Sequence, residues 1–191
     1  MITNEEKDEV VELAKELFEN ITKSKFSRKM PSKSTASGAC LYWTYAVVGA
    51  ARLHGIKLVV QAGSAFWEIT PEGEDDGVSN THFGYKWTGE MPSDSLIKTA
   101  NDLGFAPLPE VHIWAVEVES MQIVDLTVSE QPITCEAMGI GKWATPPPPE
   151  YLWHDSANLP CGLYSVERTP TLLFGSMIDR MMKNDSYDYR T

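Results

Sequence analysis

Length, composition and charge limit what this chain can be. Its 191 residues, of which 42% are hydrophobic, are enough to bury a sizeable core, and we expect one domain. Sixteen basic and twenty-seven acidic residues give a formal net charge of -11, which repels phosphate backbones and anionic lipid headgroups. We therefore expect neither nucleic acid nor a membrane surface as a partner.

The first residues and the cysteines indicate a compartment. The sequence Met-Ile-Thr-Asn-Glu-Glu-Lys-Asp has neither the basic start nor the apolar core of a secretory signal, and no later run reaches the roughly 18 apolar residues of a membrane span. Three cysteines are an odd number and too few for a disulfide framework. We expect a cytoplasmic protein, and the sequence does not indicate its oligomeric state.

Two helices are predicted in the first part of the chain. From Asn4 to about Ile21, apolar residues recur at three- and four-residue steps among charged ones, which is typical of an amphipathic helix of about five turns. The polar, serine-rich segment 26–38 is expected to be a loop. Residues 39–54 are apolar nearly all round, which indicates a central buried helix, and Gly55 provides its stop signal.

Strands and polar loops are predicted between residues 57 and 127. Residues 57–69 are rich in strand-forming types, whereas the acidic stretch 71–80 is too polar to be other than a surface loop. A short strand over 82–87 and a loop over 91–109 are expected to follow. The pattern then predicts a hairpin of two further strands, 111–118 and 122–127.

The final third is expected to be loop up to about residue 160. Four consecutive prolines, 146–149, favour a stiff polyproline II segment, which is either a rigid connector or a docking motif for a partner. Residues 169–183 carry apolar side chains at four-residue steps and predict a closing amphipathic helix. We therefore expect one domain over 1–191, with a core over about 36–128, an N-terminal helix over 4–21 and a C-terminal extension over about 133–191.

Cys40 stands at the start of the predicted central helix. The first turn of a helix carries unpaired backbone N–H groups and the positive end of the helix dipole, which favour a thiolate over a thiol. Because Gly38 and Ala39 are small, we expect that end to be accessible, with the Cys40 backbone N–H aimed at a developing oxyanion. The simpler interpretation is that Cys40 is one more small residue of a buried helix.

The predicted hairpin places a histidine and an aspartate on one face. Alternate residues of a strand face the same way, so His112, Trp114 and Val116 share a face. A four-residue turn over 117–120 would then set three pairs of residues opposite each other, namely Val116 with Met121, Trp114 with Ile123, and His112 with Asp125. A shift of one residue would separate the last pair.

Three residues together suggest one kind of chemistry. Alone, His112 is an ordinary half-buried strand histidine and Asp125 an ordinary turn carboxylate. With Cys40, however, they are the residue types that a cysteine nucleophile, its base and the base's orienter require. If they converge in space, they form an acyl-transfer or hydrolysis site.

Three segments also resemble the signature segments of the transglutaminase-like superfamily. That family has a helix-opening cysteine, a histidine followed two residues on by an aromatic residue within a strand, and an aspartate with a following threonine in the next strand. The resemblance covers about residues 36–128. The matching segments are Ser37-Gly38-Ala39-Cys40 with the helix after it, the strand His112-Ile113-Trp114-Ala115-Val116-Glu117-Val118, and Ile123-Val124-Asp125-Leu126-Thr127.

The resemblance implies an α+β, papain-like fold, in which the helix that carries the cysteine packs on an antiparallel β-sheet. It assigns Cys40 as nucleophile, His112 as general base and acid, and Asp125 as orienter. Such enzymes include transglutaminases, cysteine proteases, peptide N-glycanases and related amidases, which share an acyl-thioester intermediate. The family often adds a second oxyanion donor from a Trp, Tyr or Gln side chain, and no position of this sequence matches a motif for one.

We therefore predict a cysteine hydrolase or acyltransferase that acts on a peptide or protein amide, with hydrolysis slightly ahead of amine transfer. Protein cross-linking by the same residues is one alternative, and a catalytically silent binding or structural module is another. No cofactor and no metal are expected, because the remaining candidate ligands lack the close pairs of a zinc site. Those ligands are Cys135, Cys161, His82 and His154.

Overall fold

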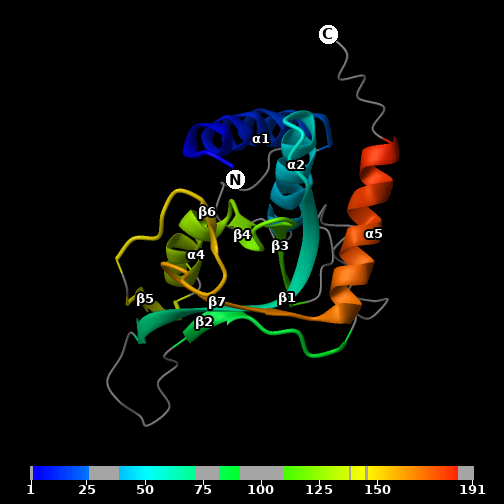
Figure 1. Ribbon diagram of the computed structural model, residues 1–191. Coiled ribbons are helices and arrows are strands. Elements are labelled where there is room, and N and C mark those ends of the chain that lie inside the picture. Colours follow the sequence, from blue (N-terminus) through cyan, green and yellow to red (C-terminus); the bar gives the residue numbers. More distant parts are fainter. Residues whose placement is uncertain are drawn as a thin grey trace.

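Helices and a curled antiparallel sheet make this an α+β protein (Figure 1). The computed structural model describes residues 2–25, 39–71, 82–90, 110–137, 139–144 and 146–184. Its helices are α1 (Asn4–Lys25), α2 (Ala39–Leu53), the 3-10 helix η1 (Val128–Glu130), α4 (Gln131–Ala137) and α5 (Arg168–Asn184). Its strands are β1 (Leu58–Pro71), β2 (His82–Tyr85), β3 (His112–Glu117), β4 (Gln122–Asp125), β5 (Gly141–Trp143), β6 (Leu152–Asp155) and β7 (Leu163–Val166).

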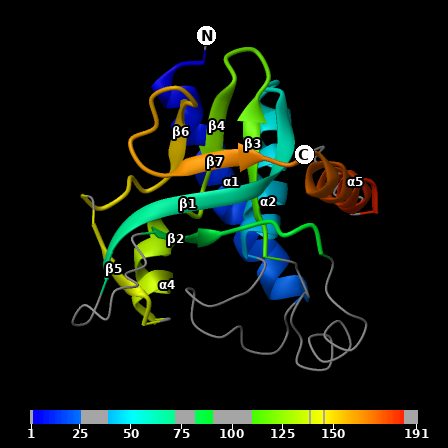
Figure 2. The ribbon, with the colours of Figure 1, turned by 90° about the horizontal axis from the view of Figure 1, so that it is seen from below.

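The long strand β1 organises the sheet. Its first half pairs with β3, its middle with β2 and β7, and its end with β5, all antiparallel. Gly63 lies opposite His112 on one side and Val166 on the other, so β3 and β7 flank the same point of β1. The hairpin strand β4 then extends the sheet to β6. Figure 2 shows the curve of β1 between β7 and β2.

The two N-terminal helices pack over the part of the sheet formed by β1, β3 and β4. Helix α2 is apolar and mostly buried, and its Thr44 hydroxyl donates a hydrogen bond to the carbonyl oxygen of Ile113 in β3 at 3.1 Å. Helix α1 covers α2 (Figure 1), and the rings of Phe18 and Trp43 stack between them with centroids 3.9 Å apart. Burial of these apolar faces, rather than helix propensity, fixes where α2 begins relative to the sheet.

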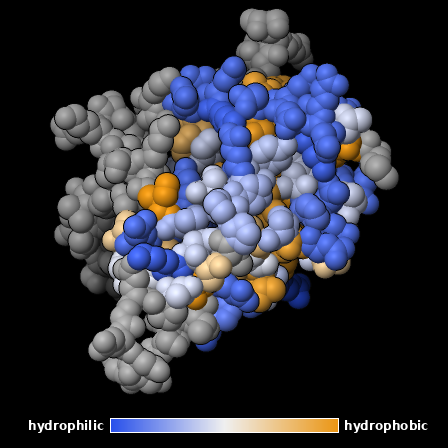
Figure 3. All heavy atoms as spheres, turned by 90° about the vertical axis from the view of Figure 1, so that its left-hand side faces the viewer, coloured by the Kyte–Doolittle hydropathy of each residue, from blue (hydrophilic) through white to orange (hydrophobic). Residues whose placement is uncertain are grey.

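The outer face of α1 is acidic and exposed. Figure 3 shows hydrophilic residues along the upper part of one side of the molecule, at the level of α1. The helix begins with a capping box, in which the Glu6 N–H donates to the Thr3 hydroxyl and the Thr3 N–H donates to the Glu6 carboxylate. Within the described ranges, none of the helices has the length and apolar character needed to cross a bilayer.

The C-terminal region contains more regular structure than the sequence predicts. The expected loop over 133–160 contains most of α4 and the strands β5 and β6, and the following strand β7 is also unpredicted. These elements have three to seven residues. That is too short for a hydrophobic period to be visible, and pairing with β1 and β4 stabilises the strands instead. The proline run 146–149 has neither helix nor strand.

Three predicted loops have little or no described structure. The segment 26–38 and the loop 91–109 lie outside the described residues, and so does the acidic stretch apart from Pro71, which ends β1. The remaining long elements agree with prediction to within a few residues, because α1, α2, β1 and α5 have clear apolar periods or continuous apolar runs.

The β3–β4 register differs from the predicted one by two residues. Val116 lies opposite Ile123 and Ala115 opposite Val124, so the predicted pairing of Val116 with Met121 is wrong. Continuing the observed register sets Trp114, rather than His112, opposite Asp125. Because side chains alternate with a period of two, an even shift leaves every residue on its face. His112 and Asp125 therefore still share one face, as diagonal neighbours.

Local turn chemistry explains the shift. The four-residue loop covers 118–121 rather than 117–120, because the Glu117 carboxylate accepts hydrogen bonds from the N–H groups of Glu119 at 2.9 Å and Ser120 at 2.6 Å. Met121 closes the loop with a positive φ of 58° and donates its N–H to the Glu117 carbonyl oxygen at 2.9 Å. The Glu117 side chain thus belongs to the turn, while its backbone ends β3.

We expect Gly63→Ala to destabilise the protein by about 3 kcal/mol or more. A Cβ on Gly63 would lie 2.1 Å from the carbonyl oxygen of Ser165 and 2.9 Å from the amide nitrogen of Glu167, so β7 would have to leave β1. Urea unfolding measures the effect. Gly175→Ala in α5 is the matched control, because its Cβ would meet nothing within 4 Å and alanine favours a helix by about 0.5–1 kcal/mol. Equal stability of the two variants would contradict the assigned strand pairing.

Candidate active site

His112 and Asp125 form a buried pair at the start of β3 and the end of β4. The Nε2 atom of His112 lies 2.7 Å from Oδ2 of Asp125, and the two side chains are each only 1% exposed. An ionised carboxylate can only accept, so Nε2 carries the proton and donates it. The sequence predicted this pair, and the structure brings it together through a diagonal rather than a direct cross-strand contact.

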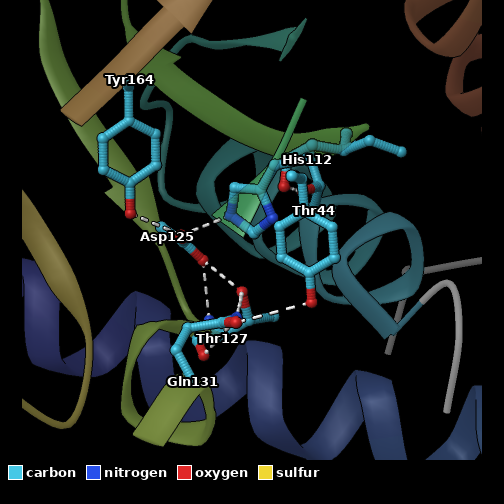
Figure 4. A network of polar contacts seen from close by, with 8 residues as sticks. Thr44, His112, Asp125, Thr127, Gln131 and Tyr164 are labelled. Carbon is cyan, nitrogen blue, oxygen red and sulfur yellow. Dashed lines mark hydrogen bonds and ion pairs between the residues drawn. The ribbon is translucent and has the colours of Figure 1, made fainter. Parts of the chain in front are cut away.

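Four donors surround the Asp125 carboxylate. Oδ1 accepts hydrogen bonds from the backbone N–H of Thr127 at 2.8 Å and from its hydroxyl at 2.7 Å, a local turn that the Asp-Leu-Thr sequence allows. Oδ2 accepts the His112 proton and, at 2.8 Å, the hydroxyl of Tyr164 in β7. Figure 4 shows Asp125 between His112 and Tyr164, with Thr127 on its other side. A carboxylate has about four lone-pair sites, and here all of them are used.

A second layer of hydrogen bonds holds Thr127. The side-chain amide of Gln131 donates to the Thr127 carbonyl oxygen at 3.1 Å and to its hydroxyl at 3.4 Å. The Gln131 amide oxygen accepts the hydroxyl of Tyr85 at 3.5 Å. Tyr85 also stacks nearly parallel on the His112 ring, with centroids 5.3 Å apart. The chain from Tyr85 through Gln131 and Thr127 therefore links the carboxylate to a ring that covers the imidazole.

Aromatic rings exclude water from the imidazole. Trp67 contacts its edge with centroids 5.5 Å apart, Trp114 lies at 6.0 Å, and Tyr164 at 5.9 Å. Trp67 and Trp114 are each 1% exposed. In such a site the charge of Asp125 acts on His112 with little screening, which strengthens the pair relative to one in water.

The predicted nucleophile begins the helix that packs against this strand. Cys40 is the second residue of α2 and is half-buried, so its N–H is one of the first four in the helix that have no intrahelical acceptor. One turn later, Thr44 bonds to the carbonyl oxygen of Ile113, next to His112 in the chain. That hydrogen bond and the helical period direct the Cys40 side of α2 to the start of β3.

The free ring nitrogen and the thiol complete the arrangement. Nδ1 of His112 is buried and has no conventional hydrogen-bond partner among the described residues. After Asp125, Cys40 is the group that most raises the pKa of the His112 ring. Because Asp125 occupies Nε2, we assign Nδ1 as the nitrogen that faces the thiol.

Opposing effects set the charge of the pair. Burial disfavours the imidazolium, but the charge and hydrogen bond of Asp125, with the nearby Cys40 thiol, raise the pKa of His112 above its ordinary value. Burial also disfavours the carboxylate, yet His112 and the two Thr127 donors hold the pKa of Asp125 below its ordinary value. At neutral pH the pair is therefore carboxylate and imidazolium, the charge state that would stabilise a thiolate.

The other two cysteines have different surroundings. Cys135 is completely buried and donates its S–H to the Gly141 carbonyl oxygen at 3.3 Å. Cys161 is half-buried, and burial together with the negative charge of Asp125 raises the pKa of its thiol to about 11. Neither has a histidine base assigned to it. In the described ranges, no three His, Cys, Asp or Glu side chains gather as a metal ion would require.

The sequence pattern did not predict three residues of this site, Tyr85, Gln131 and Tyr164. Tyr164 lies on β7, which short-range patterns do not reveal, and Tyr85 is an ordinary strand tyrosine until the fold stacks it on His112. For the hydrogen bonds around Asp125, the sequence pattern indicated one residue, Thr127, which follows Asp125 by two positions.

A separate groove of about 620 Å³ lies between α2, β1 and α5. Its lining is mainly apolar, with the charged side chains of Arg52, Lys57 and Asp179, and it includes no cysteine or histidine. It therefore offers neither a thiol nor an imidazole for the proposed chemistry.

Comparison with known proteins assigns no function to this site. No family model matches the chain, and no curated protein matches it. A crystal structure described only as a genomics target is similar over 92% of this chain and 76% of its own, with 10% sequence identity and a TM-score of 0.45. A similarity of that level supports no assignment of function.

Proposed function

We propose that the chain is a thiol-dependent acyl-transfer enzyme with a transglutaminase-like, papain-like core, which hydrolyses an amide bond through an acyl-thioester on Cys40. The observation that carries the proposal is the buried His112–Asp125 hydrogen bond of 2.7 Å, on the strand against which the helix that begins with Ala39 and Cys40 packs. The sequence pattern of the superfamily supports the same three roles.

In the proposed reaction His112 accepts and returns a proton twice, once in each half of the cycle. His112 takes the Cys40 proton to form the resting imidazolium–thiolate pair, and the thiolate then attacks the carbonyl carbon of the amide, so that the carbonyl electron pair moves to oxygen. When the C–N bond breaks, the imidazolium gives its proton to the leaving amine and a thioester remains. His112 then takes a proton from water, and the hydroxide adds to the thioester carbon. When the C–S bond breaks, the acid is released and the imidazolium returns its proton to the Cys40 sulfur.

Backbone groups at the start of α2 would stabilise the charge on the carbonyl oxygen. The N–H of Cys40 is available there, because the first N–H groups of a helix lack intrahelical acceptors and lie at the positive end of its dipole. Asp125 takes no proton during this cycle. Its role is to keep the Nε2 proton in place, so that Nδ1 can exchange a proton with sulfur.

A small activated acyl ester tests the proposal without knowledge of the natural substrate. We expect p-nitrophenyl acetate to acetylate Cys40 and release p-nitrophenolate in a burst, followed by slower release of acetate. Mass spectrometry of quenched samples locates the acetyl group, and Cys40→Ala removes both the adduct and the burst. A fluorescent primary amine offered with a glutamine-bearing peptide then separates hydrolysis, which yields free acid, from transamidation, which yields the labelled peptide.

Cys135→Ala is the matched control, because that thiol is buried and bonded to Gly141. It should retain both the burst and the adduct. If acetylation is equally slow at all three cysteines, the chain is a silent module on this fold and the enzyme proposal is wrong.

A further inference from the structure

Tyr164 donates to the same carboxylate oxygen as His112. The hydroxyl of Tyr164 lies 2.8 Å from Oδ2 of Asp125, and Nε2 of His112 lies 2.7 Å from it (Figure 4). Tyr164 is positioned by strand pairing, since it lies opposite Ala65 of β1, and by an edge contact with Trp114 at 5.2 Å between centroids. The site thus includes a residue from the C-terminal region, beyond the segments that carry the family resemblance.

This shared oxygen has a chemical consequence. Two donors on one oxygen compete for its charge, so each hydrogen bond is weaker than it would be alone. Burial raises the pKa of the Tyr164 phenol well above its ordinary value, as does the charge of Asp125, so the hydroxyl stays a donor at every working pH. The two Thr127 hydrogen bonds to Oδ1 prevent the carboxylate from rotating away.

We propose that Tyr164 is a positioning residue, which fixes the Asp125 carboxylate and limits how strongly it holds the imidazolium proton of His112. This inference rests on the proposed function for its catalytic meaning. A base that holds its proton too strongly would not return it to the leaving amine. Tyr164 therefore sets the balance between accepting the thiol proton and giving it up.

The titratable groups around His112 come from several elements. They are Cys40 from α2, Tyr85 from β2, Asp125 from β4, Glu130 from η1, Cys161 from the turn before β7, and Tyr164 from β7. Of these groups, the hydroxyl of Tyr164 and the imidazole of His112 are the side chains that share Oδ2. Removal of one hydroxyl therefore changes one of the two hydrogen bonds and leaves the charged groups in place.

Tyr164→Phe tests the inference by NMR of the His112 ring. The other histidines, His54, His82 and His154, are exposed, and their replacement by Gln leaves a single ring signal. In that background we expect Tyr164→Phe to move the Nε2–H proton downfield at neutral pH and to raise the pKa of His112 by about one pH unit. A role in packing alone would leave both quantities unchanged, because phenylalanine keeps the ring.

Tyr151→Phe is the matched control. Its hydroxyl also donates to an aspartate, Asp8, but on the outside of α1, so the same chemical change is made far from His112. We expect the His112 signal to be unchanged in this variant. An unchanged or upfield signal in Tyr164→Phe would overturn the inference.

The two proposals fail in different ways. The NMR signal of His112 does not require turnover, so a downfield shift together with uniformly slow acetylation would reject the enzyme and keep the positioning role. Acetylation confined to Cys40 with no NMR response to Tyr164→Phe would keep the enzyme and reject the positioning role.

Discussion

Iodoacetamide at about pH 7 should alkylate Cys40 on the order of 100-fold faster than Cys135 or Cys161. The thiolate is the reactive form of a cysteine, and in the proposed site the imidazolium of His112 would stabilise that form at Cys40. With a pKa of about 11, Cys161 is ionised to only about one part in ten thousand at that pH, and Cys135 has no exposure at all. Peptide mapping by mass spectrometry over a time course gives the three rates from one sample.

His112→Gln should remove the difference between Cys40 and the other thiols. The amide cannot carry the positive charge that favours the thiolate, so Cys40 should react at the rate of an ordinary half-buried thiol. Cys135 reports whether the variant is folded, because it is completely buried and becomes reactive only if the core opens. Fast labelling of Cys40 in a folded His112→Gln protein would contradict the assigned base.

Asp125→Asn should reduce acyl transfer by on the order of 10³–10⁴-fold, the scale seen when the orienting carboxylate of another hydrolase triad becomes an amide. The asparagine oxygen can still accept the two hydrogen bonds of Thr127, which turns its NH₂ group toward Nε2 of His112. Nε2 must then accept, so the ring proton moves to Nδ1 and the ring can no longer take a proton from sulfur. The burst with p-nitrophenyl acetate measures the loss, and a burst of normal size would contradict the orienting role of Asp125.

The loss of stability caused by Asp125→Asn should depend on pH. The pKa of His112 is raised from 6.5, so its contribution is complete below about pH 6.5 and is lost as pH rises through the raised pKa. The pKa of Asp125 is lowered from 3.8, so its contribution is present above about pH 3.8 and is lost as pH falls through the lowered pKa. Urea unfolding should therefore show the widest gap between native protein and Asp125→Asn, on the order of 3 kcal/mol, between about pH 4 and 6.5. If the difference in unfolding free energy between the two proteins widened above pH 8, the charges assigned to His112 and Asp125 would be wrong.

Long periodic segments of the sequence determined the elements that carry the proposed chemistry. The apolar run after Cys40 is long enough to specify a buried helix, and the short runs of strand-forming residues around His112 and Asp125 specify two strands. Because side chains alternate along a strand, the hairpin places His112 and Asp125 on one face. The two-residue error in register did not affect that conclusion, because an even shift preserves the face. The order cysteine, histidine, aspartate was therefore sufficient to nominate the three residues.

The surroundings of those residues depend on contacts between distant parts of the chain. Strand β7 has four residues and no period of its own, and only its pairing with β1 brings Tyr164 to Asp125. Likewise, Tyr85 reaches His112 because β2 pairs with β1 on the same side as β3. Short strands are stabilised by their neighbours rather than by their own composition, so local patterns cannot reveal them. The sequence thus predicted the pair of His112 and Asp125, and the tertiary structure alone decided which groups hold that carboxylate and keep its site dry.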